Sequence, residues 1–291
     1  MIVEHLPVLL REVVDMLSPS GGGTYIDATI GLGGHSEEIL KMIGQDGRVI
    51  GIDRDEEALK RTAGRLQDKR LVLKKGRFSQ VEALLGSIGV KEADGILFDL
   101  GVSMMQFRDL QRGFSFNSDE RLDMRMDSTQ GLSAHEVVNG YPEKDLIRIL
   151  KEYGEEYKAP RIVRAIMFAR GGKSIDTCSE LADIVSSAIG RRGRIHPATK
   201  TFQALRIEVN REIDELKEGL DASLRILKSG GRLCVISYHS LEDRVVKNFI
   251  RDNARQGQLR PLVKKPVVPA MRETRENPSS RSAKLRGAER L

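Results

Sequence analysis

Cysteine, tryptophan and long apolar runs are scarce or absent in this 291-residue chain, and each absence excludes a class of protein. Two cysteines, Cys178 and Cys234, cannot build a disulfide framework or a multi-cysteine zinc site, and their isolation is typical of a reducing compartment. No apolar run approaches the roughly 18 residues of a membrane span, and the charged start of the chain is unlike a signal peptide. No spacing of histidine, cysteine and aspartate indicates a metal centre. We therefore expect a cytoplasmic protein with no membrane segment and no metal.

Aromatic residues are also few, with 8 Phe, 5 Tyr and no Trp, so an aromatic side chain near a proposed site is conspicuous. The net charge of +6 is unevenly distributed, because residues 251–291 carry +7 and the other 250 residues sum to −1. This basic tail favours contact with a polyanion. Proline, arginine and serine become more frequent after Asn253, and the helical period fades. The sequence therefore predicts a tail that is extended or folds only on contact.

Short apolar strands and helices alternate over the first hundred residues. The expected strands are Thr24–Thr29, Arg48–Asp53, Leu71–Lys74 and Gly95–Asp99, separated by stretches with helical spacing. Alternation at this spacing indicates right-handed βαβ units and a parallel sheet. The prediction is an α/β fold with a doubly wound, Rossmann-like sheet.

The pattern changes in the middle of the chain. From about residue 104 to 210 there is no convincing strand, but there are several amphipathic helices. A periodic apolar run from Phe202 to Leu227 predicts one long helix or two in series, and Arg232–Ser237 predicts a fifth strand. We expect a discontinuous nucleotide-type domain, residues 1–104 and 211–291, interrupted by an all-helical domain, residues 105–210.

The glycine loop after the first strand fits two ligands unequally. A dinucleotide fingerprint requires G-x-G-x-x-G, whereas here Gly31, Gly33 and Gly34 leave the third glycine in the wrong place. Asp27 ends the preceding strand, where a carboxylate repels a pyrophosphate but suits an ammonium group. S-adenosylmethionine carries such a group, a sulfonium and a ribose, and no phosphate. The loop favours S-adenosylmethionine, while a purely structural turn is the alternative.

Two further residues fit a nucleoside without identifying it. Asp53 ends the second strand and is placed to accept both hydroxyls of a ribose, which NAD and S-adenosylmethionine share. Phe78 follows the third strand, where an adenine could stack, although a core phenylalanine is equally consistent with the pattern.

The loop after the fourth strand, beginning at Asp99, leaves the edge of the sheet at which ligands bind in open α/β folds. An exocyclic amine on a base is a poor nucleophile, because its lone pair is drawn into the ring. Acceptors for its N–H groups return electron density as a methyl group arrives, so positioning and electrostatics suffice. Asp99 and Ser103 are the candidate catalytic residues.

Long motifs in this order resemble one known family. They are HLPVLLREVV from His5, DATIGLGGHS from Asp27, GIDRD from Gly51, GILFDLGVS from Gly95, RGFSF from Arg112, LDMRMD from Leu122, HPATKTFQALRIEVN from His196, HSLEDR from His239 and RSAKLR from Arg281. Nearly from end to end, the chain resembles the MraW/RsmH methyltransferases, which methylate the exocyclic N(4) of a cytidine (position 1402 in the usual numbering) in bacterial 16S ribosomal RNA of the small ribosomal subunit.

The resemblance implies S-adenosylmethionine as cofactor and a helical substrate domain within the sheet domain. Family residues usually include a second serine after Ser103 and often a proline before the glutamine, whereas this chain has Met104-Met105, so no role for a second hydroxyl is carried over. The cofactor-binding residues that the resemblance implies are Gly33, Gly34, His35, Asp53, Phe78, Asp99 and Gln106.

Several other patterns have two interpretations each. HSLEDR after the fifth strand is either a helix start, with Ser240 and Asp243 as its polar pair, or a ligand contact. His35 is either a polar cap or a contact to the cofactor carboxylate. A basic stretch in the inserted domain is either a solvated face or an RNA contact: Arg191, Arg192, Arg194, Lys200 and Arg206. One of three phenylalanines, Phe107, Phe114 or Phe116, is a candidate for holding an unstacked cytosine.

Together these patterns predict a cytoplasmic S-adenosylmethionine-dependent RNA methyltransferase whose partner is 16S rRNA or the small ribosomal subunit. Two rivals stay open, an NAD-type oxidoreductase on the same fold and a non-catalytic RNA-binding protein with a relict site. The sequence leaves open whether the substrate is naked RNA or an assembled subunit, and whether the protein forms a homodimer.

Overall fold

The computed structural model describes residues 7–101, 112–116, 118–190 and 196–291. The chain divides into two compact units, residues 1–101 with 213–291 and residues 102–212, and each unit has its own hydrophobic core. The inserted unit begins just after β4, where the strand–helix alternation of the sequence stops, and it ends between two helices, at residue 212. That the second unit recognises substrate stays a prediction.

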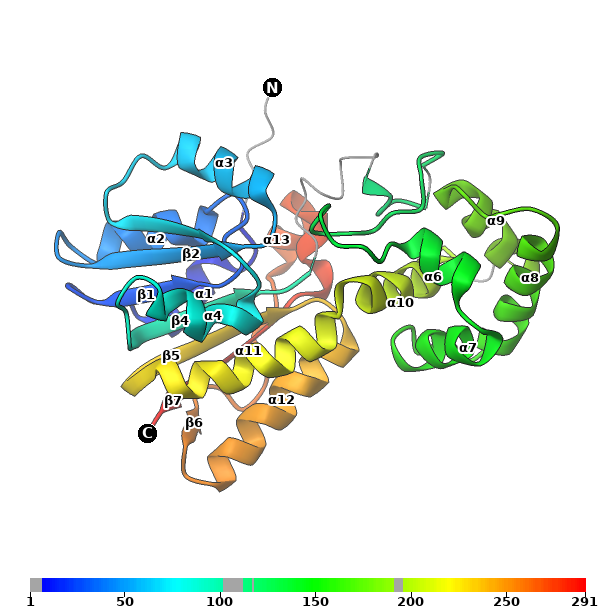
Figure 1. The fold of residues 1–291 in the computed structure, drawn as a ribbon. Coiled ribbons are helices and arrows are strands. Elements are labelled where there is room, and N and C mark those ends of the chain that lie inside the picture. Colours follow the sequence, from blue (N-terminus) through cyan, green and yellow to red (C-terminus); the bar gives the residue numbers. More distant parts are fainter. Residues whose placement is uncertain (1–6, 102–111, 117, 191–195) are drawn as a thin grey trace. The chain divides into compact units, whose positions relative to one another are not determined.

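A seven-stranded sheet forms the centre of the first unit (Figure 1). Its strands are β1 Thr24–Asp27, β2 Arg48–Asp53, β3 Leu71–Lys75, β4 Ala93–Asp99, β5 Leu227–Ser237, β6 Leu259–Pro261 and β7 Lys284–Arg290. The order is β3-β2-β1-β4-β5-β7-β6. Neighbours among β1 to β5 are parallel, whereas β7 runs antiparallel to both β5 and β6. The predicted α/β class and doubly wound sheet are confirmed.

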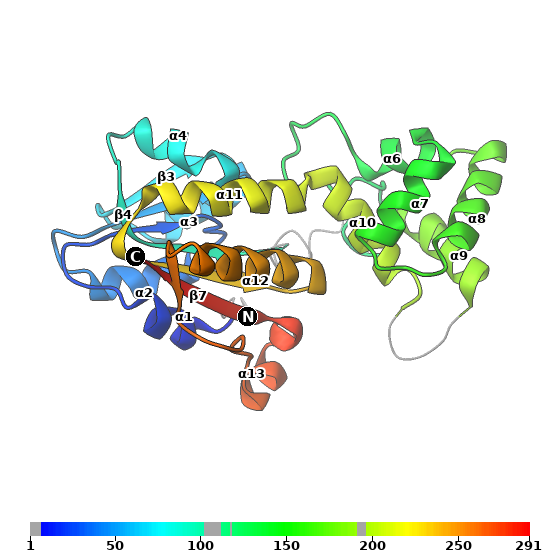
Figure 2. The ribbon, with the colours of Figure 1, turned by 90° about the horizontal axis from the view of Figure 1, so that it is seen from below.

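Both faces of this sheet are buried, as near-continuous apolar strands predict for a parallel sheet. Ile26, Ile50 and Ile96 face the core beneath α4, α11 and α12, whereas the alternate residues Tyr25 and Val49 face α1 and α2 (Figure 2). The helices of this unit are α1 Leu10–Leu17, α2 Gly34–Met42, α3 Glu56–Arg65, α4 Val81–Gly86, α11 Glu212–Ile226, α12 Ser240–Arg255 and α13 Met271–Glu276, with 3-10 turns at Phe78–Gln80 and Pro278–Ser282.

The basic C-terminal segment is folded, so the prediction of an extended tail is wrong. Strand β7 lies between β5 and β6, and Leu285 and Ala288 are completely buried. Its outward-pointing basic residues are paired, because Arg286 Nε donates to Asp243 Oδ1 of α12 at 2.7 Å and Lys284 Nζ to Oδ2 at 3.3 Å. The prediction failed because the seven residues of β7 are mostly basic or small, which is a composition typical of a disordered tail.

We expect Asp243→Ala to lower the free energy of unfolding by about 2 kcal/mol, because it leaves the half-buried Arg286 guanidinium without its carboxylate partner. Burial raises the pKa of Asp243, but Arg286 and Lys284 together lower it by more than burial raises it. The pKa of Asp243 therefore lies below the usual range. The stabilisation is therefore present at neutral pH and lost as pH falls through that lowered pKa. Urea unfolding at pH 7 and at low pH measures both effects. Asp252→Ala, which removes an exposed pair with Arg251 on the same helix, is the control and should unfold as the wild type does.

The second unit contains five helices in its described residues: α6 Ala134–Gly140, α7 Glu143–Glu152, α8 Ala159–Gly172, α9 Cys178–Ile189 and α10 Thr199–Asn210. Apart from one isolated bridge between Arg121 and Thr177, the described part of this unit holds no β-structure. The periodic run that predicted one helix or two forms two, since Arg211 between α10 and α11 has a left-handed φ of 51°. In neither unit is any helix of the described residues long and apolar enough to cross a membrane.

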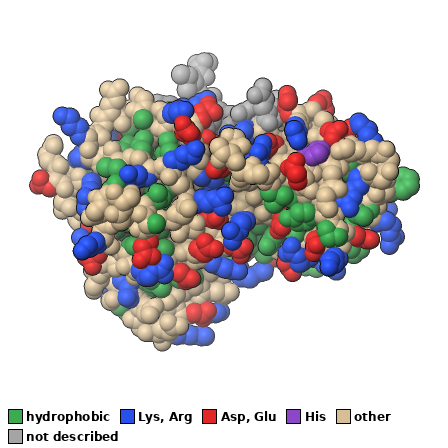
Figure 3. Space-filling model, in the orientation of Figure 1, with side chains coloured by type: hydrophobic (Ala, Val, Ile, Leu, Met, Phe, Trp, Pro, Cys, Tyr) green, Lys and Arg blue, Asp and Glu red, His purple; other side chains and the backbone are tan. Residues whose placement is uncertain are grey.

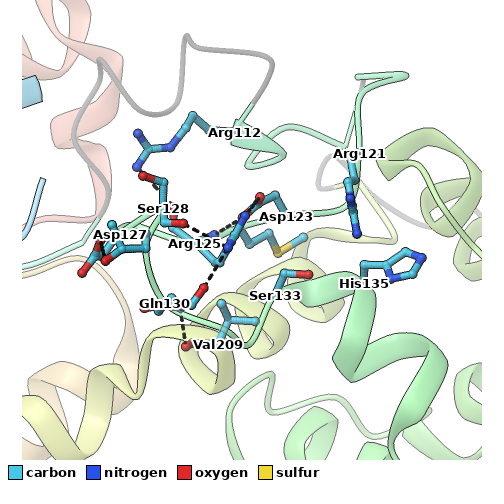
Figure 4. Close-up of polar contacts among 12 residues, drawn as sticks. Arg112, Arg121, Asp123, Arg125, Asp127, Ser128, Gln130, Ser133, His135 and Val209 are labelled. Atoms are coloured by element: carbon cyan, nitrogen blue, oxygen red, sulfur yellow. Dashed lines mark hydrogen bonds and ion pairs between the residues drawn. The ribbon is translucent and has the colours of Figure 1, made fainter.

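The LDMRMD motif forms a loop that is built around Arg125 (Figure 4). Its guanidinium makes paired bonds to Asp123, at 2.8 and 2.7 Å, and donates to the carbonyls of Ser128 and Gln130. Asn210 at the end of α10 fixes the same loop. Its Nδ2 donates to the carbonyl of Met124, and its Oδ1 accepts from the amide N–H of Met126. The polar side chains of the motif therefore stabilise the backbone of the loop itself.

Candidate functional site

Three carboxylates end three neighbouring parallel strands. Asp27 ends β1, Asp53 ends β2 and Asp99 ends β4. In the ladder, Asp27 pairs with Gly51 of β2 and with Leu97 of β4, so the other two acids lie two residues further along on the strands beside it. The carboxyl edge of an open parallel sheet is where ligands bind in α/β folds.

The glycine loop between β1 and α2 has a backbone that only glycine accommodates. Gly33, the N-cap of α2, has φ 75°, and a Cβ there would lie 2.7 Å from Leu66 Cδ1. A Cβ on Gly34 would clash with Pro7 Cγ. The loop therefore brings bare backbone and the N-terminus of α2 to the carboxyl edge, where the first amides of a helix have no intrahelical partner.

Asp53 is joined to this loop. Its Oδ2 accepts the N–H of Gly31 and its Oδ1 accepts the N–H of Asp55, both at 2.9 Å. Burial raises the pKa of Asp53 above the usual range. A carboxylate has about four lone-pair positions, so two backbone bonds orient it and leave acceptor capacity for a ligand.

His35 turns its ring into the protein and Gly33 is the N-cap of α2, so of the two interpretations of His35 the polar cap is excluded, while the contact to the cofactor carboxylate stays a prediction. Its Nε2 is 3.0 Å from the carbonyl oxygen of Val8, and its Nδ1 is 3.9 Å from Asp99 Oδ2. Burial lowers the pKa of His35 below its ordinary value, which keeps the ring neutral at pH 7. At the N-terminal end of α2, His35 can therefore offer a ligand its backbone N–H but not its ring.

Asp99 is held by two residues that the sequence reasoning missed. Tyr238 Oη donates to its Oδ1 at 2.8 Å, and its own amide N–H donates to Thr29 Oγ1 at 2.6 Å. Burial raises the pKa of Asp99 to about 7, with the Tyr238 bond opposing and Glu242 adding to that rise. Tyr238 directly follows β5, so its position at the carboxyl edge was the available signal.

Asp27 is fixed in the same layer. Ser36 Oγ of α2 donates to its Oδ2 at 2.7 Å. Burial raises the pKa of Asp27 to about 6, and the nearby Asp99 raises it as well. Two buried carboxyl groups with raised pKa values in one layer favour a ligand that carries positive charge.

Phe78 begins the turn after β3 and is only 8% exposed. Its ring meets Phe98 edge-on at 5.7 Å, and the Arg54 guanidinium lies 5.8 Å from its centroid. These contacts make Phe78 part of the core beneath α11. Its role beside an adenine stays a prediction.

Comparison with known proteins identifies the family. The model of the MraW methylase family matches residues 2–291. The chain belongs to this family. As a member of the MraW methylases it has the predicted S-adenosylmethionine-dependent methyltransferase class, which is thereby confirmed.

Relatives of this MraW methylase match it over their full length. It is 49% identical over 295 residues to the ribosomal RNA small subunit methyltransferase H of Persephonella marina, covering 100% of both chains. It is 46% identical over 305 residues to the protein of the same name from Caldicellulosiruptor bescii, covering 99% of both. A solved structure of a presumed rRNA-methylase from Clostridium thermocellum, 14% identical, matches with a TM-score of 0.50 over 99% of this chain and 100% of that one. That last likeness shows the fold alone.

Some predicted site residues of this methylase lie outside the described residues. They are the catalytic candidate Ser103, the cofactor candidate Gln106, the departure Met104-Met105, Phe107, and the basic residues Arg191, Arg192 and Arg194. Their roles stay predictions.

The remaining candidates of the second unit separate into structural and exposed residues. Phe114 is 7% exposed and belongs to the core, and Arg206 forms a paired salt bridge with Glu212 at 2.9 and 2.8 Å. Phe116 stacks on His196 with ring centroids 4.3 Å apart. Lys200 is exposed, with its Nζ 5.6 Å from the centre of the Tyr157 ring.

HSLEDR begins α12, with a cap one residue earlier than predicted. His239 is the N-cap, and Glu242 accepts from the amides of Tyr238 and His239 at 2.8 and 3.3 Å. Asp243, the predicted partner of Ser240, instead binds the basic residues of β7. The helix-start interpretation of the motif is therefore confirmed, with different residues in the capping roles.

Proposed function

We propose that this methylase transfers a methyl group from S-adenosylmethionine to the exocyclic N(4) amine of a cytidine in 16S rRNA. The observation that carries the proposal is the layer of Asp27, Asp53 and Asp99 beside a glycine loop, in a chain whose full-length relatives are named ribosomal RNA small subunit methyltransferases. The cytidine and its N(4) come from the family resemblance of the motifs.

The donor set fits the proposed cofactor. A Cβ at Gly33 or Gly34 would meet the side chains of Leu66 or Pro7, so the two glycines let the loop pack against its own protein and hold the N-terminus of α2 at the carboxyl edge. The three strand-end acids suit a sulfonium and an ammonium group and oppose a pyrophosphate, which disfavours the NAD-type alternative. When bound, S-adenosylmethionine supplies a methyl group already activated by the positive charge on sulfur.

The chain's own residues then have separate binding roles. Asp53 accepts from the ribose hydroxyls with the lone pairs that its two backbone bonds leave. Gly34 and the amide of His35 present N–H groups to the carboxylate, at the positive end of the α2 dipole, whereas the N–H of Gly33 donates to the carbonyl of Ile30 at 2.7 Å and Gly33 shapes the turn. Asp27 stabilises the ammonium group, and Gln106 is assigned to the cofactor by resemblance.

Asp99 acts on the acceptor. Its ionised carboxylate accepts an N–H of the cytosine amine, which returns electron density to nitrogen as the new C–N bond forms. The bond between the methyl group and the cofactor sulfur breaks in the same step, so S-adenosylhomocysteine is the leaving group. The methylated amine is acidic and loses its proton to water, so no strong base is required. Ser103 is assigned a second acceptor role, and the cationic product state is stabilised by the same acids.

Transfer of labelled methyl groups tests the function. Purified protein is incubated with labelled S-adenosylmethionine and either assembled small subunits or free 16S RNA from a strain that lacks the modification. We expect label on the N(4) of one cytidine in at least one substrate. No label in either RNA, with intact cofactor binding, would support the non-catalytic alternative, and calorimetry that detects NAD but not S-adenosylmethionine would support the oxidoreductase.

The pH dependence of transfer should change when the hydroxyl of Tyr238 is removed. In the wild type, kcat/KM should rise with pH through about 7, because burial raises the pKa of Asp99 to about 7 and the ionised form is the active one. Tyr238→Phe removes a bond that lowers this pKa, so the rise should move to higher pH. Equal rates at high pH with unequal rates at pH 6 are the expected signature. Coincident profiles would remove Asp99 as the titrating group.

A further inference from the structure

An exposed row of aromatic and basic residues runs along helix α8 of the second unit and the turn before it. Tyr157, just before the helix, is 92% exposed and Phe168 is 88% exposed, in a chain with only 13 phenylalanines and tyrosines. Arg161 and Arg164 are exposed between them. The spacings of three and four residues place Arg161, Arg164 and Phe168 along one side of α8, and Tyr157 lies in the turn just before the helix. We call Tyr157, Arg161, Arg164 and Phe168, together with the neighbouring Lys200, the α8 stripe.

Packing does not account for the α8 stripe. The opposite side of α8 carries Ile162, Val163 and Ile166, which are at most 1% exposed and belong to the core of the second unit. That apolar side packs the helix on the core, and Arg170 near its C-terminus donates to the carbonyl of Val138 at 2.7 Å, so the stripe residues are not needed to hold the helix. Large aromatic side chains this exposed are unusual, and they mark contact sites when charged residues surround them.

The charges of the α8 stripe are not neutralised by acidic groups. Helix α8 contains no acidic residue, and within the described part of the chain neither Arg161 nor Arg164 forms an ion pair. Lys200 Nζ donates to the carbonyl of Glu155 at 2.8 Å and lies over the Tyr157 ring, so it adds positive charge beside that aromatic. On the face drawn in Figure 3, basic, acidic and hydrophobic side chains are interspersed over the second unit.

We propose that the α8 stripe binds unpaired nucleotides of the RNA substrate, with Tyr157 and Phe168 stacking on bases and the basic residues contacting phosphates. This proposal rests on the RNA substrate of the proposed function. Aromatic rings accept any base on their faces, and arginines between them follow the backbone, which is how proteins hold single strands. A rise of about 1.5 Å per residue separates Arg161 from Phe168 by about 10 Å along α8, and Tyr157 extends the stripe beyond the start of the helix, which is enough for a few nucleotides.

The two kinds of side chain should affect RNA binding differently. Filter binding with free 16S RNA across a salt series measures both affinity and salt dependence. Tyr157→Ala and Phe168→Ala should each weaken binding about tenfold with an unchanged salt slope, because a stack is lost but no phosphate contact. The double variant Arg161→Ala/Arg164→Ala should weaken binding and reduce the slope of log affinity against log salt by about 1.5. Tyr157→Phe should restore wild-type binding.

Matched controls distinguish the α8 stripe from charge in general. Lys144→Ala/Lys151→Ala removes the same charge from exposed positions of α7. This variant should lose less RNA affinity than the arginine variant, and its salt slope should fall by less. Calorimetry with S-adenosylmethionine should give wild-type affinity for every variant. Wild-type RNA affinity and slope in all stripe variants would overturn the proposal. So would loss of binding to assembled subunits with wild-type binding to free RNA, which would assign the stripe to a ribosomal protein.

The outcome is separable from that of the proposed function. If the wild type transfers no methyl group but its RNA affinity depends on the α8 stripe, the function fails and the surface stands. If the wild type methylates RNA and the stripe variants bind as tightly as it does, the surface fails and the function stands.

Discussion

Replacing Asp99 with asparagine should lower the rate of methyl transfer by about 10²- to 10³-fold. The substitution keeps the size of the side chain and an oxygen that accepts from Tyr238, but it removes the negative charge that the amine needs as it becomes cationic. The substitution should lower kcat, the rate at saturating substrates, because the interaction strengthens only in the transition state. Single-turnover transfer from S-adenosylmethionine to the preferred RNA substrate measures it.

The same variant decides between the two roles predicted for Asp99. If Asp99 mainly acts on the acceptor amine, calorimetry should give S-adenosylmethionine affinity within a few-fold of the wild type. If it mainly holds the cofactor, affinity and rate should fall together. Asp94→Asn, near the start of the same strand and bonded to the amide of Thr24, is the control and should retain full activity. An Asp99→Asn enzyme with a third of wild-type activity would remove the residue from the chemistry.

Asp53→Ala should weaken S-adenosylmethionine binding by about 30- to 100-fold. Two hydrogen bonds from hydroxyls to a charged acceptor are lost, each contributing roughly 1 to 1.5 kcal/mol net. The variant also frees the amide of Gly31, so the glycine loop loses one of its fixed points. Isothermal calorimetry with S-adenosylhomocysteine measures the loss without turnover.

The control for Asp53 lies two residues away. Asp55 is the N-cap of α3, with its side chain accepting from the amide of Glu57 at 3.1 Å. Asp55→Ala should therefore lower the melting temperature, as loss of a helix cap does, and leave cofactor affinity close to that of the wild type. Equal losses of affinity in the two variants would show that α3 matters and that Asp53 does not contact the ribose.

The strand-end acids could be predicted from the sequence, because each lies at the end of an apolar run and parallel strands all bring their carboxyl ends to one edge. The orientation of His35 could not be predicted, since it depends on the carbonyl of Val8, which reaches the ring only in the folded unit. The position of Tyr238 directly after β5 indicated the carboxyl edge, but its bond to Asp99 could not be predicted, because the two residues are 139 positions apart in the sequence. Strand β7 was missed because its partners determine it more strongly than its own composition does.

Strand β7 also determines when the sheet is complete. Until residues 284–290 leave the ribosome, β5 has no neighbour on its outer side and presents an open row of backbone donors and acceptors. Such an edge is a template for pairing with other chains. Because the second unit separates β4 from β5 in sequence, the sheet must also wait for that unit to be synthesised. During its own synthesis, this methylase therefore depends on the last strand of the chain for protection against aggregation.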